Sequence, residues 1–182
     1  MSLIQRTTTV GLDSEIDRAQ QRLYNKLNPV WGGDWSCFPR IYKNKRVDND
    51  GQEYFVPEYL DGIKEYTTDT LFNDRVDVTS FFLEGDNIVV SGDGRVLESD
   101  VSLIFSCLID NIYSSSEKMD MKMRADILSV INKFLYSWEL ENVYITVDEV
   151  YREFRKEDLN FSDLSNRHLL RFDFKVKYSL NC

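Results

Sequence analysis

The fold is decided by residues 168–180, which read HLLRFDFKVKYSL. Every even-numbered position after His168 is apolar, and every odd-numbered position except Leu169 is polar. Side chains along a strand point alternately to the two faces of a sheet, so this pattern predicts a long strand with one buried and one solvated face. Residues 101–113 alternate too, but their second face is only half polar. This segment is predicted to be a central strand covered on both sides.

Two amphipathic helices are predicted to pack on the sheet. The first is capped by Asp13 or Ser14 and is expected to end near Asn28, because Pro29 disfavours helical geometry in the residue before it. Its apolar residues form one stripe of Ile16, Ala19, Leu23, Leu27 and Val30. The second helix follows residues 114–116, a run of serines that offers an N-cap. Its apolar face comprises Met119, Met123, Ile127, Val130, Ile131 and Phe134.

Shorter segments complete the predicted sheet. Further strands are predicted at residues 37–43, 53–60, 78–83 and 143–147. Residues 44–52 read as a polar turn, and Pro57 places the following strand at an edge or a bend. Glycines at 85 and at 92 and 94 flank Ile88 and its neighbours, which suggests a hairpin-like excursion. Asp148 is expected to cap one or two helical turns.

The order of these elements defines the fold class. A helix is followed by several strands, a second helix, a strand, a short helix and a last strand, and the short connections favour antiparallel pairing. Neither βαβα alternation nor a repeat of fixed period is present. The sequence therefore predicts an α+β fold, with a mostly antiparallel, twisted sheet packed by two main helices. Residues 12–182 form one domain, preceded by an extended arm at residues 1–11.

Composition narrows the classes of function. The net charge of −9 repels phosphate backbones and argues against a dedicated nucleic-acid binder. Four cations, Arg40, Lys43, Lys45 and Arg46, could still form a local basic patch, although a solvated turn is the favoured interpretation. An acidic surface can also line a passage through which DNA slides without sticking.

Cysteine usage and hydropathy predict where the chain is made. Cys37, Cys107 and Cys182 lack the spacing of a metal site or a redox motif. The polar residues 1–9 lack the apolar core of a signal peptide, and no stretch approaches the roughly 20 apolar residues of a membrane span. We therefore expect a protein of the reducing cytoplasm with no membrane partner.

Candidate catalytic and metal-binding residues are few. The single histidine, His168, continues the apolar face of the last strand, so a structural position is favoured over catalysis. The Asp48, Asp50 and Gly51 sequence is similar to a calcium loop. Arg46 and Pro57, however, stand where its first and last carboxylates are needed, which favours a solvated turn.

Other possible sites have simpler structural interpretations. Glu53 and Glu58 could in principle flank a glycosidic bond, but nothing distinguishes them from other carboxylates. Trp31, Trp35 and Trp138 could stack on a sugar, although packing in the core or at an interface is favoured. The methionines at 119 and 123 fit a core better than a cofactor site. We expect no enzymatic activity, no catalytic or metal-binding residues and no cofactor.

Several segments, taken in order, resemble small structural proteins of tailed phages of Bacteroidetes, including crAss-like phages. They are similar to tail-terminator or head–tail connector (neck ring) subunits. The similarity is one of pattern and order, and it spans most of residues 12–182. The segments are residues 12–17 (LDSEID), 20–24 (QQRLY), 39–42 (PRIY), 56–59 (VPEY), 80–82 (SFF), 101–105 (VSLIF), 124–126 (RAD) and 168–182.

The resemblance implies a tail-terminator-like fold and a role in the virion. Copies would close into a ring that joins the portal to the tail in the phage neck, after assembly in the host bacterial cytoplasm. Their partners would be further copies, neighbouring portal, neck or tail proteins, and DNA passing through the lumen without specific binding. Acids such as Asp86 and Asp93 are expected to face that passage. The alternatives are another assembly or adaptor role, capsid-associated or of a secretion type, and a small soluble binding module.

Overall fold

The computed structural model describes residues 2–3, 9–60, 66–67, 76–91, 94–113, 120–155 and 166–179. Its strands are β1 (Ser2–Leu3), β2 (Trp35–Val47), β3 (Glu53–Leu60), β4 (Tyr66–Thr67), β5 (Val78–Ser91), β6 (Val96–Cys107), β7 (Trp138–Tyr144) and β8 (His168–Ser179). Its helices are α1 (Gly11–Trp31), α2 (Ile109–Ile112), α3 (Asp120–Phe134) and α4 (Val147–Val150). The predicted α+β class is confirmed.

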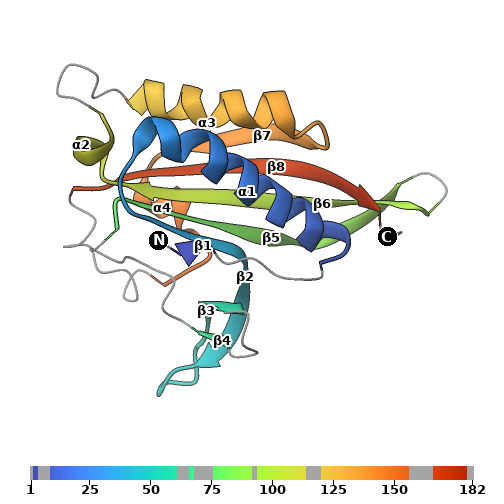
Figure 1. Cartoon of the computed structure of the whole chain (residues 1–182). Helices are drawn as coiled ribbons and strands as arrows, with labels where there is room; N and C mark the ends of the chain where they lie inside the picture. The colour runs from blue at the N-terminus through green and yellow to red at the C-terminus, as the bar shows by residue number, and fades with distance from the viewer. Residues whose placement is uncertain are drawn as a thin grey trace.

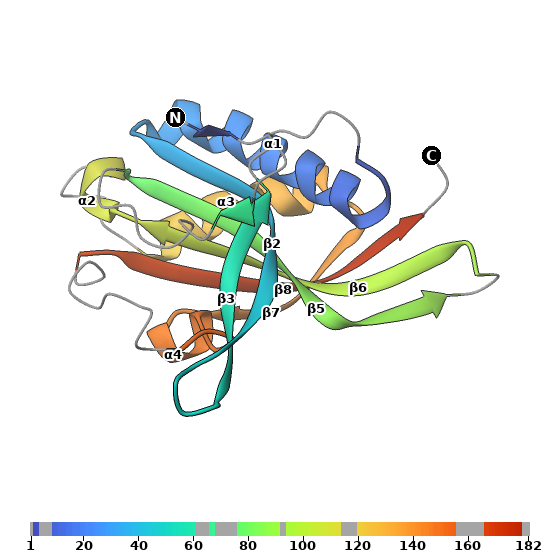
Figure 2. The same ribbon diagram turned by 90° about the horizontal axis from the view of Figure 1, so that it is seen from below.

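One twisted sheet organises the molecule, in the order β4-β3-β2-β5-β6-β8-β7, with β1 beside β2 (Figures 1 and 2). The β2–β5 and β1–β2 pairs are parallel, and the other pairs are antiparallel. The sheet is therefore mixed but mostly antiparallel, as predicted. Ser2 and Leu3 pair with Ser36 and Cys37 of the same chain, so this part of the predicted arm needs no partner chain.

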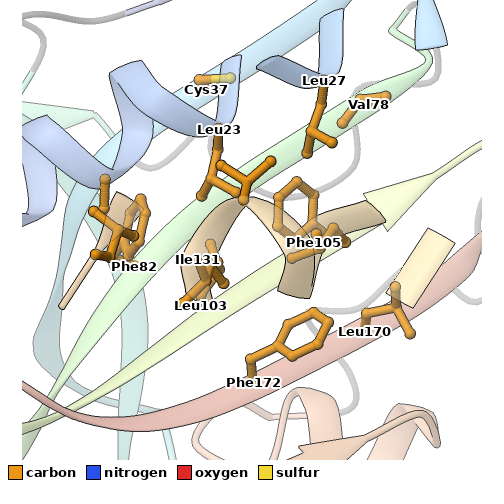
Figure 3. Packing of buried hydrophobic residues seen from close by; sticks show 14 of the residues in the cluster. Leu23, Leu27, Cys37, Val78, Phe82, Leu103, Phe105, Ile131, Leu170 and Phe172 are labelled. Atoms are coloured by element: carbon orange, nitrogen blue, oxygen red, sulfur yellow. The ribbon is translucent and has the colours of Figure 1, made fainter. Parts of the chain in front are cut away.

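The two faces of the sheet are covered differently. The long helices α1 and α3 lie side by side on one face, and the short α4 lies on the other (Figures 1 and 2). The larger core lies under the long helices, where Leu27 and Ile131 pack towards Phe105 and Phe172 (Figure 3). A smaller core lies under α4 and comprises Phe38, Ile41, Phe81, Leu83, Ile104, Val150, Tyr151, Phe154 and Leu169.

Strand β8 follows the predicted alternation only in its second half. Its even-numbered face is buried as predicted, and Phe172, Phe174 and Val176 are fully buried. The odd-numbered face was predicted to be solvated, which is wrong for Leu169 and Arg171, exposed by 6% and 2%. The reason is α4, whose side chains cover that end of the second face and leave the rest of it open.

Helix α1 is longer than the sequence predicts. It begins at Gly11 with Val10 as the N-cap rather than Asp13 or Ser14, and it continues through Pro29 to Trp31. Burial of Trp31 explains the extension, because its ring stacks on that of Trp35 at a centroid distance of 5.5 Å. Pro29 removes one backbone hydrogen bond from the last turn, and the helix is closed beyond it by the Gly32 N–H, which donates to the carbonyl of Asn28.

Two further strands are also longer than predicted. Residues 44–47, predicted as part of a turn, continue β2 and pair with β3, so the turn shrinks to residues 48–52. Strand β5 continues past Gly85 to Ser91 with an irregularity between Glu84 and Ile88. A Cβ atom at Gly85 would lie 2.9 Å from that of Asp100, so the irregular strand depends on glycine here. The predicted separate excursion is thus the outer half of one long β5–β6 hairpin.

Three boundaries in the second half of the chain differ from the predictions. Strand β6 ends at Cys107, and α2 replaces the predicted end of that strand. The strand predicted at 143–147 lies earlier, as β7, because Trp138 joins the core against Phe82 and Phe174. Thr146 rather than Asp148 is the N-cap of α4. The predicted serine cap at 114–116 and Met119 lie outside the described residues.

Alkaline pH is expected to destabilise this fold. Burial raises the pKa of Cys37 to about 11, although a hydrogen bond with Ser80 partly opposes it, and burial also raises the pKa of Cys107. An unfolded thiol loses its proton near pH ~8.5. Above that pH the folded chain keeps protons that the unfolded chain releases, so stability falls as pH rises towards the folded pKa of Cys37. Urea unfolding measured across this range tests the prediction.

The control for this pH dependence is Cys37→Ala, which should flatten the decline in stability above pH ~8.5 without removing it, because Cys107 remains. A stability that is constant from neutral pH to the folded pKa of Cys37 would contradict the prediction.

Candidate functional site

A small cavity lies beside the only histidine. It has a volume of about 160 Å³ and is lined by Met123, Ile145, Val147 and residues 167–170. Pockets that bind drug-sized ligands usually measure about 300–1,000 Å³. His168 itself opens β8 opposite Cys107 and is half-buried. The cavity is therefore too small for an ordinary organic ligand, and His168 occupies a sheet position like its neighbours.

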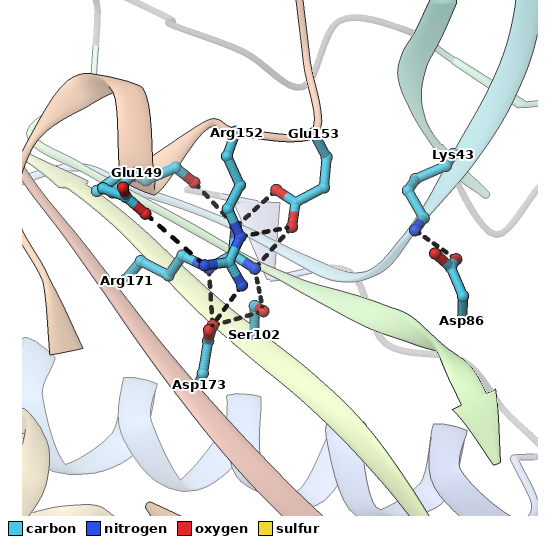
Figure 4. Close-up of polar contacts among 9 residues, drawn as sticks. Lys43, Asp86, Ser102, Glu149, Arg152, Glu153, Arg171 and Asp173 are labelled. Atoms are coloured by element: carbon cyan, nitrogen blue, oxygen red, sulfur yellow. Dashed lines mark hydrogen bonds and ion pairs between the residues drawn. The ribbon is translucent and has the colours of Figure 1, made fainter. Parts of the chain in front are cut away.

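A buried arginine is the centre of the largest polar cluster (Figure 4). Arg171 on β8 donates from both terminal nitrogens to Glu153, at 2.6 and 2.7 Å. It also donates from Nε to Asp173 at 2.7 Å, and from its terminal nitrogens to the hydroxyl of Ser102 at 2.7 Å and the backbone carbonyl of Val150 at 3.3 Å. These bonds use all five donors of the guanidinium.

The charges of this cluster stabilise the fold by holding Arg171 between Glu153 and Asp173. We call these three residues the Arg171 clamp. Burial of Arg171 opposes its charge, but hydrogen bonds and attraction from Glu153 and Asp173 outweigh burial and raise its pKa. Arg152 is 41% exposed and bonds Asp173 at 2.9 Å, which extends the network to the surface. Arg171 has no donor left for a ligand, and its bonds to Glu153 and Val150 fasten the segment that contains and follows α4 to β8.

The sequence did not predict this cluster. Arg171 and Asp173 lie on the odd-numbered face of β8, which the alternation assigns to solvent, and Glu153 follows α4 at a distance in sequence that no motif marks. A groove of about 320 Å³ continues from the cluster across the open half of this sheet face. Its carboxylates are Glu84, Asp86, Asp100, Glu141, Glu153 and Asp173, and its cations are Lys43, Arg152 and Arg171.

The cations of the predicted basic patch are each paired with a neighbouring carboxylate. Lys43 pairs with Asp86 at 2.6 Å, Lys45 with Glu53 at 2.5 Å and Arg46 with Glu58 at 3.0 Å. Arg40 contacts the carboxylates of Asp13 and Glu84. These cations lie on strand β2, so the interpretation as a solvated turn is wrong. Each of these cations is paired with a carboxylate, so the patch has little net positive charge.

The other sequence candidates have local structural roles. Asp48 accepts backbone hydrogen bonds from Asp50 and Gln52 and bonds the Arg155 guanidinium at 3.1 Å, so its carboxylate closes the β2–β3 turn. Glu53 and Glu58 are five residues apart on β3, which places them on opposite faces of the strand. The three tryptophans, at 31, 35 and 138, are all in the core. Among the described residues, no three His, Cys, Asp or Glu side chains are arranged to hold a metal ion.

The outer half of the β5–β6 hairpin exposes aliphatic side chains. Ile88, Val89 and Val90 are 55%, 56% and 63% exposed, and Val96, which pairs with Ser91 on the neighbouring strand, is 38% exposed. Neighbouring residues point to opposite faces, so Ile88 and Val90 lie on one face of the ribbon and Val89 lies on the other, beside Glu98. We call residues 88–90 the apolar tip. The sequence contained the signal, three consecutive aliphatic residues between glycines, but the length of the projecting ribbon became clear only in the structure (Figure 2).

Of the two acids predicted to face a DNA passage, Asp86 and Asp93, the structure describes only Asp86. The side chain of Asp86 is 84% exposed and holds Lys43 near the point where β2 leaves β5. Asp93 lies outside the described residues.

Comparison with known proteins adds no further assignment. A scan against models of protein families finds no match, and a search of curated proteins finds no significant match. Within the described residues, none of the helices has the length and apolar character needed to cross a membrane.

Proposed function

We propose that this protein is a structural subunit that self-associates through the apolar tip and forms a ring in the neck or tail of a tailed phage. The observation that carries the proposal is the exposure of three consecutive aliphatic residues on a ribbon that projects from the sheet. Burying one such side chain contributes about 1.5–3 kcal/mol. Exposed aliphatic side chains that gather on one projecting segment of a globular protein often mark a contact with another protein.

Two further features support a ring rather than an enzyme. The largest polar cluster has its buried arginine saturated by protein partners, so it offers structure instead of chemistry. The tip projects from one end of the sheet (Figure 2), and the aliphatic side chains of Val143 and Ile145 are exposed elsewhere, so a second copy can bind the tip through a different surface. Such a head-to-tail contact repeated around an axis closes into a ring. The place of this ring in a phage neck rests on the resemblance of the ordered sequence segments.

A lysine in the apolar tip is expected to abolish self-association. Val90→Lys puts a charge into the contact and should lower the association constant by about tenfold or more, since at least one buried valine is lost. The mass of the species in solution, measured by light scattering after size exclusion, should fall to that of the monomer. Val47→Lys is the matched control, because Val47 is also on a strand and is 60% exposed.

The same measurement can contradict the proposal in two ways. A wild-type chain that remains monomeric at every concentration would overturn self-association. A Val90→Lys variant that assembles like the wild type would remove the tip from the contact. Ionic strength gives an independent test, because each copy carries a net charge of −9. Salt should strengthen an apolar contact between such copies by screening their repulsion, whereas it would weaken a contact made of ion pairs.

The location in the virion needs its own experiment. Cryo-electron microscopy of a native phage particle that encodes this chain should show copies of the fold between the portal and the tail, around the DNA channel. Finding the fold only in the capsid shell, or absent from the particle, would overturn the neck assignment while leaving self-association intact.

A further inference from the structure

Two of the strand edges that have no neighbouring strand among the described residues lie on β5 and β7. Strand β2 pairs with β5 only as far as Ile41 and Leu83, so the outer edge of β5 beyond that point has no partner there. On the other side, β7 pairs with β8 along one edge, and its second edge has no described partner. Figure 2 shows the β2–β3 hairpin turning away from the β5–β6 hairpin.

Both edges expose aliphatic side chains. The β5 edge carries the apolar tip, and residues 87–91 (NIVVS) have no charged side chain. At the β7 edge, Val143 and the following Ile145 are 37% and 52% exposed. Natural proteins usually protect an edge with charges, proline or a covering segment, and an apolar edge left open invites pairing with another chain. The uncharged residues 87–91 of the β5 edge would not repel the acidic Glu139 and Glu141 of β7. The acids at the inner end of this edge, Glu84 and Asp86, are paired with Arg40 and Lys43.

The strand directions suit these two edges to each other. Each neighbouring pair from β5 through β6 and β8 to β7 is antiparallel, so β7 runs opposite to β5. A second copy placed beside the first by rotation about an axis roughly along the strands would keep these directions. It would present its β7 antiparallel to β5 of the first copy. Antiparallel pairing is slightly more stable per residue than parallel pairing.

The two edges are staggered along the strands. Ile88 pairs with Ser99, Ser99 with Val176, and Val176 with Trp138, so Ile88 lies in the same row as the first residue of β7. The apolar tip therefore extends beyond the row where β7 begins. Full pairing requires each copy to shift along the strand direction relative to its neighbour. A ring absorbs such a shift when its strands tilt relative to the ring axis, as in a closed barrel.

From these features we infer that the outer edge of β5 in one copy pairs with the free edge of β7 in the next, so that the sheet continues from copy to copy. This inference rests on the proposed function, since it assigns the two surfaces of the self-association contact. The occupant of the β5 edge is a second copy of this chain. The contact is heterologous, with a different edge from each copy.

Cysteine cross-linking tests this pairing. On a Cys182→Ser background, Cys37 and Cys107 remain but are buried. Val89→Cys marks the β5 edge, and Asn142→Cys marks the exposed middle of β7. A short, flexible bis-maleimide should give a cross-linked dimer in a mixture of the two single variants, and little from either variant alone. A chain with both substitutions should give a ladder of products that ends at the size of the ring.

The control replaces Val89→Cys with Val47→Cys, which is similarly exposed but lies on β2, and it should give no product above background with Asn142→Cys. Efficient cross-linking of Val89→Cys to itself would overturn the inference in favour of a symmetric contact. Absence of the mixed product from variants that still assemble by light scattering would also overturn it, without affecting self-association. A background chain that is monomeric at all concentrations would instead refute the proposed function, and the inference would fall with it.

Discussion

Replacing Glu153 with alanine is expected to lower the free energy of unfolding by about 3 kcal/mol, because it strands a buried charge. Glu153 accepts two short hydrogen bonds from the Arg171 guanidinium, which is 2% exposed. Without that carboxylate, at least two donors face a site that water reaches poorly, and the α4 segment loses its attachment to β8. Urea unfolding followed by circular dichroism measures the loss as a lower midpoint at unchanged slope.

The neighbouring Glu149 provides the matched control for this prediction. Its side chain is 52% exposed and lies 3.8 Å from the surface Arg152, so Glu149→Ala should change stability by less than about 0.5 kcal/mol. Arg171→Met gives a second contrast, since it removes the buried charge itself and keeps most of the volume. Its cost should be clearly smaller than that of Glu153→Ala. Equal losses of unfolding free energy in Glu153→Ala and Glu149→Ala would contradict the stabilising role of the bonds between Glu153 and Arg171.

Replacing Trp31 with alanine is expected to cost about 4 kcal/mol, within the range for a buried aromatic residue. The side chain is 3% exposed and packs on Trp35 and, edge to face, on Phe105 and Tyr113. Its indole nitrogen also donates to Asp126 at 2.9 Å, which ties α1 to α3. Loss of this anchor should let α1 end near Asn28, so thermal unfolding should begin at a lower temperature with some loss of helical signal.

Two substitutions separate the causes of this loss. Tyr136→Ala removes an aromatic ring that is 92% exposed and should be nearly neutral. Trp31→Phe keeps an aromatic ring against Trp35 but gives up the hydrogen bond to Asp126, so its cost should fall between the two. A neutral Trp31→Ala would show that packing of this ring does not hold the last turn of α1.

The parts of the fold that could be predicted are those in which one residue pattern has one physical cause. The even-numbered residues of β8 are apolar because they meet the core, and both faces of β6 are apolar because the sheet is covered on both sides there. The same reasoning placed the two long helices. It failed where a tertiary contact overrode a local preference, as when burial of Trp31 carries α1 past Pro29 or when partner carboxylates let Lys45 and Arg46 lie within a strand.

The candidate surfaces were only partly predictable, for a related reason. The run Ile88-Val89-Val90 is visible in the sequence, but its exposure depends on where β2 leaves β5, which no local pattern encodes. The Arg171 clamp is invisible for the opposite reason, because a charged residue at a solvent-facing position becomes buried only when α4 lies over it. A sequence pattern indicates whether a whole face of a strand is buried or exposed. These two features depend instead on the point along the strand where a neighbouring element, α4 or β2, stops covering it.

The central place of β8 also determines the order in which the sheet can be completed. Among the described elements β8 is the last to be synthesised, yet it must insert between β6 and β7, with Cys107 meeting His168 across a long intervening segment. Closing so large a loop costs entropy before any pairing repays it, which slows folding. A nascent chain on the ribosome therefore carries β6 with one edge open until β8 has emerged, and completion of the central sheet waits for this strand.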